Sequence, residues 1–103
     1  MAANVGAMEA FAMPLFRAGH VPLVGEWLGL PLATLAGSAR VGDAAFEEVF
    51  HPIAERLLER CDAVLRVGGP SEGADRLVTV ARARGLTVYH SLREVPGCAA
   101  AAD

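Results

Sequence analysis

The stretch "DAVLRVGGPSEGADRLVTVARARGLTVYHS", residues 62–91, decides the expected fold. Its first apolar run predicts a strand near 62–67, and its last apolar run predicts another near 86–90. Between them, apolar residues recur at helical spacing from Ala74 to Arg84. Acidic residues stand at the start of this helix and basic residues at its end, as the helix dipole favours. A strand, a helix and a strand in this order predict two parallel strands joined by a crossover helix.

The segments upstream extend the same alternation. Apolar residues at three- and four-residue steps predict one helix from Val5 to Phe16. The run "HVPLVGEW" predicts a short buried strand near 21–26. The connection that follows is apolar for a loop, and part of it, near Pro31 to Ala36, is expected to form a short helix.

Asp43 is expected to cap the next helix. The apolar stripe of this helix runs from Phe46 to Leu58, with Pro52 inside it. Because a proline removes a helical hydrogen bond, it predicts a kink or a break near Phe50–His51.

These elements predict an α/β fold, a three-layer Rossmann-like parallel sheet with flavodoxin-like strand order. Such folds usually open with a strand, whereas this chain opens on a helix, so the usual first strand is expected to be lacking. The chain has 103 residues, which predicts a single domain, residues 1–97, followed by a flexible tail at 98–103.

The charge and composition of the chain exclude several classes of binding partner. The formal net charge is −3, which leaves no basic surface for nucleic acid or an anionic membrane. The longest uncharged run, Trp27–Ala39, is shorter than the roughly 20 residues that span a bilayer. Cys61 and Cys98 are far apart and fit no metal or redox spacing. We therefore expect a cytoplasmic protein without a metal or a cofactor.

Ligands in parallel α/β sheets bind beyond the carboxyl ends of the strands. Three segments qualify here, Gly25–Trp27, Gly68–Gly73 and His90–Leu92. In the first, Glu26 and Trp27 are candidates to line a pocket, although Trp27 suits a core or an interface as well.

The second segment suggests a phosphate cradle made by Gly69, Ser71, Gly73 and Ala74, where free N–H groups at a helix start favour an anion. The same residues also suit an ordinary helix cap, with Ser71 accepting from the backbone. Both interpretations stay open, because acidic residues nearby oppose an anion.

The segments "AGHVPLVGEW", "HPIAERLLERCDAVLRVGG" and "SEGADRLVTVARARGLTVYHSLREVP" resemble a small bacterial domain family. That family is similar in fold to the nucleoside 2-deoxyribosyltransferases and the deoxynucleoside 5′-monophosphate N-glycosidases. The resemblance covers most of the chain, residues 4–97. The turn resembling "AGPY" that follows the first strand in such proteins is missing from this sequence.

The resemblance implies a motif of Asp or Ser, then Gly two residues on, then a catalytic Glu four residues later. Ser71 and Gly73 match its first two positions, but Leu77 stands where the Glu is expected. Cleavage of an N-glycosidic bond needs a carboxylate at the anomeric carbon, which leucine cannot provide. Glu72 and Asp75 are the two candidate substitutes.

The expected function is therefore binding of a nucleotide or nucleoside by a catalytically degenerate relative of the deoxyribosyltransferases. A weak N-glycosidase or deoxyribosyltransferase is one alternative, and a homotypic interaction module without a ligand is another. The apolar Trp27–Ala39 run favours a homodimer. The three histidines, His20, His51 and His90, have no spacing typical of a metal site.

Overall fold

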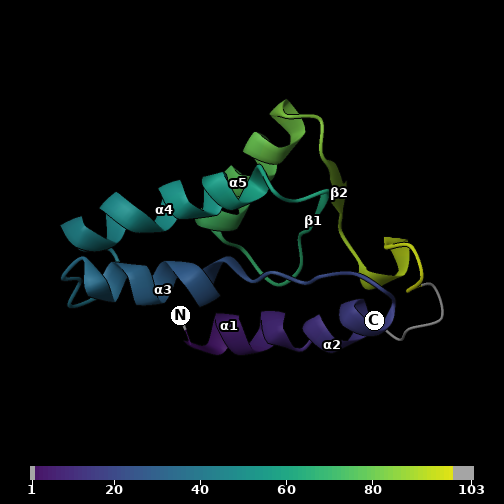
Figure 1. Cartoon of the computed structure of the whole chain (residues 1–103), viewed down its shortest axis with the longest axis horizontal. Helices are drawn as coiled ribbons and strands as arrows, with labels where there is room; N and C mark the ends of the chain where they lie inside the picture. The colour runs from purple at the N-terminus through teal and green to yellow at the C-terminus, as the bar shows by residue number, and fades with distance from the viewer. Residues whose placement is uncertain (1, 99–103) are drawn as a thin grey trace.

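The computed structural model describes residues 2–98. The chain is a mixed α/β structure whose strands form a two-stranded parallel sheet (Figure 1). The elements in chain order are α1 (Ala2–Glu9), α2 (Ala12–Arg17), α3 (Gly25–Leu35), α4 (Ala44–Leu58), β1 (Ala63–Leu65), α5 (Glu72–Ala83), β2 (Thr87–Tyr89) and the 3₁₀ helix η1 (Leu92–Glu94). Helix α4 lies alongside α3, and α1 and α2 run along the opposite side of the molecule from α5 (Figure 1).

The strand–helix–strand unit at the C-terminal half is confirmed. β1 and β2 pair in parallel, with Val64 opposite Val88. The N–H of Arg66 donates to the carbonyl of Tyr89 at 2.8 Å, one residue beyond the strand. Helix α5 connects the strands, and Ser71 caps its start. The predicted segments 62–67 and 86–90 therefore contain the observed strands.

The helix expected after Asp43 is also confirmed. The Asp43 carboxylate accepts from the N–H of Phe46 at 2.9 Å, which satisfies a donor that has no partner within the helix. Of the expected kink or break near Phe50–His51, the break is wrong, because α4 continues through Pro52 to Leu58.

The third predicted strand, 21–26, is wrong. The backbone is extended at Val24, but α3 begins at Gly25 and includes the residues expected to end the strand. Helix α3 is also longer than the expected helix at 31–36. It packs closely on α4 at Gly29, where an added Cβ would lie 2.8 Å from Cδ1 of Phe50.

The single N-terminal helix predicted from Val5 to Phe16 is two helices. Pro14 has no N–H to donate to the carbonyl of Ala10, which weakens a continuous helix at this point, although α3 and α4 continue through Pro31 and Pro52. The helix is interrupted by a turn at Ala10–Phe11, and α2 begins at Ala12. This break leaves Phe11 in the turn between two helices.

The best-buried cluster lies beyond β2. Leu92, Val95 and Cys98 are buried together there. Partly buried residues pack against them from α2, the turn before it and both strands, namely Phe11, Leu15, Ala18, Leu65 and Tyr89. Cys98 was expected to begin a flexible tail, and its burial places it in the core instead; residues 99–103 lie outside the described part. Within residues 2–98, no helix has the length and apolar character to cross a membrane.

Candidate functional site

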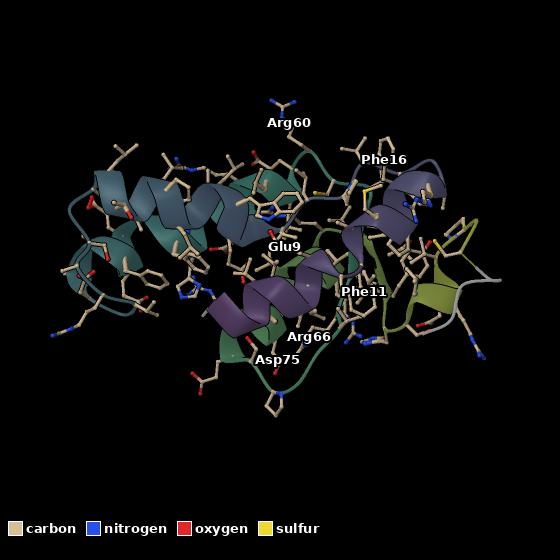
Figure 2. All side chains as sticks on the ribbon, turned by 90° about the horizontal axis from the view of Figure 1, so that it is seen from below. Glu9, Phe11, Phe16, Arg60, Arg66 and Asp75 are labelled. Atoms are coloured by element: carbon tan, nitrogen blue, oxygen red, sulfur yellow. The ribbon has the colours of Figure 1, made fainter. Side chains whose placement is uncertain are left out.

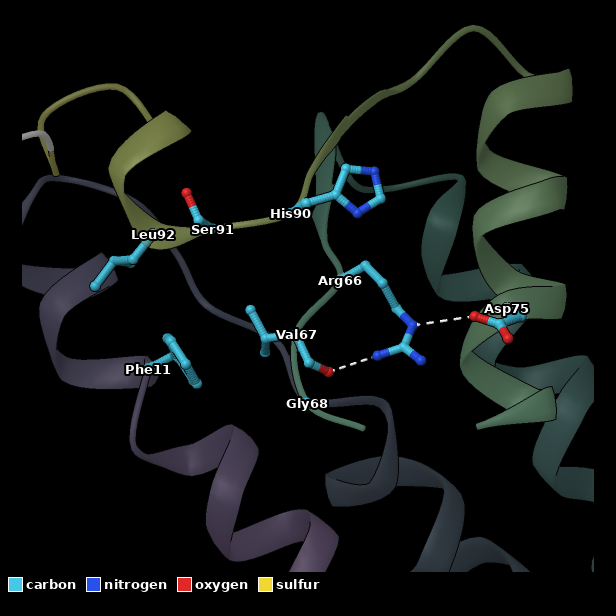
Figure 3. Close-up of a pocket in the computed structure, with 8 residues that line it drawn as sticks. All are labelled: Phe11, Arg66, Val67, Gly68, Asp75, His90, Ser91 and Leu92. Atoms are coloured by element: carbon cyan, nitrogen blue, oxygen red, sulfur yellow. Dashed lines mark hydrogen bonds and ion pairs between the residues drawn. The ribbon is translucent and has the colours of Figure 1, made fainter. Parts of the chain in front are cut away.

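An open pocket of about 560 Å³ lies at the carboxyl ends of β1 and β2 (Figure 3). Its walls come from the turn between α1 and α2, the two strand ends, α5 and the start of η1. The lining residues are Phe11, Arg66, Val67, Gly68, Asp75, His90, Ser91 and Leu92. The position matches the rule that ligands of parallel sheets bind beyond the carboxyl ends of the strands.

Arg66 follows β1 directly and fixes the shape of the turn after it. Its Nη1 donates to the carbonyl of Val67 at 2.6 Å, and its Nη2 donates to the carbonyl of Gly69 at 2.8 Å. Its Nε donates to Oδ1 of Asp75 at 3.3 Å. The side chain is only 15% exposed. A guanidinium carries five N–H donors, so these three contacts leave two donors for a ligand.

Asp75 comes from the first turn of α5 and contacts Arg66 directly at the edge of the pocket (Figure 3). Its side chain is 71% exposed, so the ion pair with Arg66 contributes little to stability. Only Oδ1 has a hydrogen-bond partner among the described residues. Oδ2 is therefore an acceptor that a ligand can use at small cost to the fold.

The end of β2 supplies His90 and Ser91. Glu94 holds this turn, because its Oε1 accepts from the N–H of His90 at 2.7 Å and from the N–H of Ser91 at 2.9 Å. Nη2 of Arg82 lies 3.2 Å from Nε2 of His90. This contact joins the side chain of His90, at the end of β2, to helix α5.

The apolar part of the pocket is formed by Phe11 together with Leu92 and Val67. Phe11 and Leu92 approach one another from opposite sides in Figure 3. Both also contribute to the buried cluster, in which Leu92 is a member and Phe11 packs against it. The aromatic ring is therefore positioned by the core and borders the pocket at the same time.

The residues predicted to cradle a phosphate do not line this pocket. Ser71 accepts from the N–H of Ala74 at 3.2 Å, as an ordinary helix cap does. The carbonyl of Gly69 accepts from Arg66. An added Cβ on Gly73 would lie 3.6 Å from Cε1 of His51, so this glycine faces α4. The proposed cradle therefore has its serine already engaged in capping.

The two candidate carboxylates differ in position. Asp75 lines the pocket, whereas Glu72 and Leu77 do not. Two residues along a helix are separated by about 160°, which accounts for Asp75 and Leu77 lying on different faces. The carboxylate nearest a bound ligand is thus Asp75.

The other predicted pair, Glu26 and Trp27, lies in α3 outside the pocket. Nε1 of Trp27 donates to Oε2 of Glu9 at 2.7 Å and so connects α3 to α1. Figure 2 shows Glu9 between these two helices.

Several pocket residues were not among the predicted site residues. Arg66 could have been found, because a charged residue at the end of an apolar strand, just before two glycines, is unusual. The segment His90–Leu92 was predicted as one of three possible ligand-binding strand ends, and it lines this pocket. The sequence around Phe11 does not indicate that this residue lines the pocket, since its position depends on the break between α1 and α2.

Comparisons of this chain with family models, curated proteins and solved structures found no match. Among residues 2–98, no group of three or more His, Cys, Asp or Glu side chains is arranged to hold a metal ion. The pocket is therefore the feature of this chain that bears on its function.

Proposed function

We propose that this protein binds a nucleoside or nucleotide in the pocket at the carboxyl ends of β1 and β2. The observation that carries the proposal is the combination of an aromatic ring, a carboxylate and several donors around one pocket, from Phe11, Asp75, Arg66, His90 and Ser91. The volume of about 560 Å³ falls within the range of small-molecule sites.

The apolar side of the pocket suits a base. Phe11 offers a ring against which a planar heterocycle can pack, with Leu92 and Val67 beside it. A base placed there would leave its sugar facing the polar side, toward Asp75 and Arg66.

The polar side suits a sugar better than a phosphate. Oδ2 of Asp75 can accept from ribose hydroxyls, and the remaining N–H donors of Arg66 can contact their oxygens. A phosphate would be repelled by Asp75 and would compete with it for Arg66. We therefore expect nucleosides to bind at least as tightly as their 5′-monophosphates.

We also propose that the chain is a degenerate relative of the deoxyribosyltransferases with a three-layer Rossmann-like fold. The parallel β1–α5–β2 unit supports this proposal, because it is the repeating unit of such sheets.

The test is a titration with nucleosides, nucleoside monophosphates and inorganic phosphate, followed by backbone amide shifts. We expect nucleosides to shift the amides of Gly68, His90 and Ser91, while the indole N–H of Trp27 stays unchanged. The proposal fails if saturating nucleoside moves none of these amides, or moves only residues of α3 and α4.

Hydrolysis of an N-glycosidic bond is a second candidate function, supported by the position of Asp75 in the pocket. We expect no useful rate, because Leu77 replaces the expected glutamate and Arg66 occupies one oxygen of Asp75. The assay quantifies free base after incubation with each deoxynucleoside monophosphate. Base release that disappears in Asp75→Ala but persists in Glu72→Ala would establish the activity and assign the carboxylate.

A further inference from the structure

Helix α3 exposes an apolar face to solvent. The side chains of Trp27, Leu28, Leu32 and Leu35 are 40%, 42%, 38% and 83% exposed. The sequence of α3, "GEWLGLPLATL", contains a single charged residue, Glu26. A helix that is apolar on nearly all sides is normally buried on nearly all sides.

The geometry of the helix separates two faces. At about 100° per residue, Leu28, Leu32 and Leu35 fall on one side, and the buried residues Gly29 and Ala33 fall on another. Gly29 faces Phe50 of α4. The interaction with α4 therefore covers one side of α3 and leaves the leucine side partly exposed.

The solvent-accessible surface of this chain is large for a protein of its mass. A compact monomer of 10.7 kDa is expected to expose about 5,500 Å². This chain exposes 6593 Å², an excess of about 1,100 Å² over that expectation. A standard protein–protein interface buries about 800 Å² on each partner, so the excess over the whole chain is comparable in size to one interface.

We propose that the outer face of α3 is a homodimer interface, in which a second copy of this chain packs its own α3 antiparallel across a two-fold axis. Such an isologous contact matches one charge-free apolar face with another of the same length. It also opposes the two helix dipoles.

Other occupants fit the face less well. A membrane-surface helix carries basic residues along its polar side, whereas α3 has none. A partner recognised by charge would find no charged side chain among Trp27, Leu28, Leu32 and Leu35. Phe16 and Leu23, which are also exposed, add apolar surface next to the start of α3 in the chain; Figure 2 shows Phe16 pointing away from the body of the molecule.

The experiment measures mass by light scattering. We expect the full chain to reach twice 10.7 kDa at high micromolar concentration. The double variant Leu32→Lys/Leu35→Lys should stay a monomer at the same concentration. Leu35→Lys alone should weaken association as well, and its side chain is too exposed to be needed for folding.

The matched control is Thr79→Lys, which adds a charge at an exposed position of α5. This variant should dimerise like the unchanged chain. The proposal is overturned if the unchanged chain keeps a mass of 10.7 kDa, if the double variant still dimerises, or if the mass increases with concentration beyond a dimer.

Discussion

Replacing Gly29 by alanine tests the close packing of α3 on α4. The new Cβ would lie 2.8 Å from Cδ1 and 3.0 Å from Cε1 of Phe50, where an ordinary carbon contact is about 3.5–4.0 Å. The Phe50 ring would have to move, and its stacking on Phe46, with centroids 4.6 Å apart, opposes the movement.

The magnitude follows from two opposing effects. Overpacking of this kind costs about 1–3 kcal/mol, while replacing glycine by alanine within a helix gains about 1 kcal/mol. We therefore expect Gly29→Ala to lower the free energy of unfolding by about 1 kcal/mol, and to lower Tm by about 4–8 °C.

The assay is urea unfolding followed by circular dichroism, with Gly25→Ala as the control. An added Cβ at Gly25 would meet only the Cβ of Ala54, at 4.0 Å, so this variant should lose no stability. If Gly29→Ala proved as stable as Gly25→Ala, the proposed approach of the two helices at Phe50 would be wrong. Both variants should be compared at one protein concentration, because the proposed dimerisation would also stabilise the fold.

Two further predictions concern the helix caps. Hydrogen bonds from the N–H groups of Phe46 and Ala39 lower the pKa of Asp43 from 3.8 to about 2; because the folded-state pKa lies below the unfolded one, the stabilisation is present above pH 3.8 and is lost as the pH falls toward 2. The stability difference between the unchanged chain and Asp43→Asn should therefore shrink over that pH interval in acid titrations, and a constant difference would contradict the assignment. Ser71→Ala should cost about 1 kcal/mol, as the loss of an N-cap does, and should leave nucleoside affinity unchanged, since Ser71 lies outside the pocket; a clear loss of affinity in calorimetry would favour the phosphate-cradle interpretation instead.

The parts of the fold that depend on local chemistry could be predicted from the sequence. Asp43 caps α4 because its side chain can reach the N–H of Phe46 a few residues away. The β1–α5–β2 unit follows from two apolar runs and the amphipathic helix between them, and the parallel pairing follows from the crossover.

The parts of the fold that depend on contacts between residues distant in sequence could not be predicted. The run at 21–26 has strand-forming residues, but no described neighbour pairs with it, and the apolar residues after Val24 become a helix that packs on α4. The helix break at Phe11 lies where Pro14 has no N–H to donate, but Pro52 does not interrupt α4, so a proline alone does not predict a break. The position of the Phe11 ring at the pocket depends on its packing against Leu92 and Cys98 far along the chain.

Only part of the candidate site could be predicted, for the same reason. The strand ends at Gly68 and His90 were expected to face a ligand, and both line the pocket. The sequence motif placed the phosphate site at Ser71, whereas the structure shows this hydroxyl accepting from Ala74. Which polar groups are already engaged with the backbone cannot be read from a motif.

The measurement that tests the central proposal most directly is the nucleoside affinity of Asp75→Asn compared with that of Glu72→Gln, by calorimetry. Both changes remove one carboxylate charge from the first turn of α5, but only Asp75 lines the pocket. A hydrogen bond to a charged acceptor exceeds one to a neutral acceptor by about 1 kcal/mol, so we expect Asp75→Asn, which keeps a neutral acceptor, to bind about fivefold more weakly, and Glu72→Gln to bind like the unchanged chain. Equal affinities for the two variants, or no measurable nucleoside binding by the unchanged chain, would contradict the proposed function.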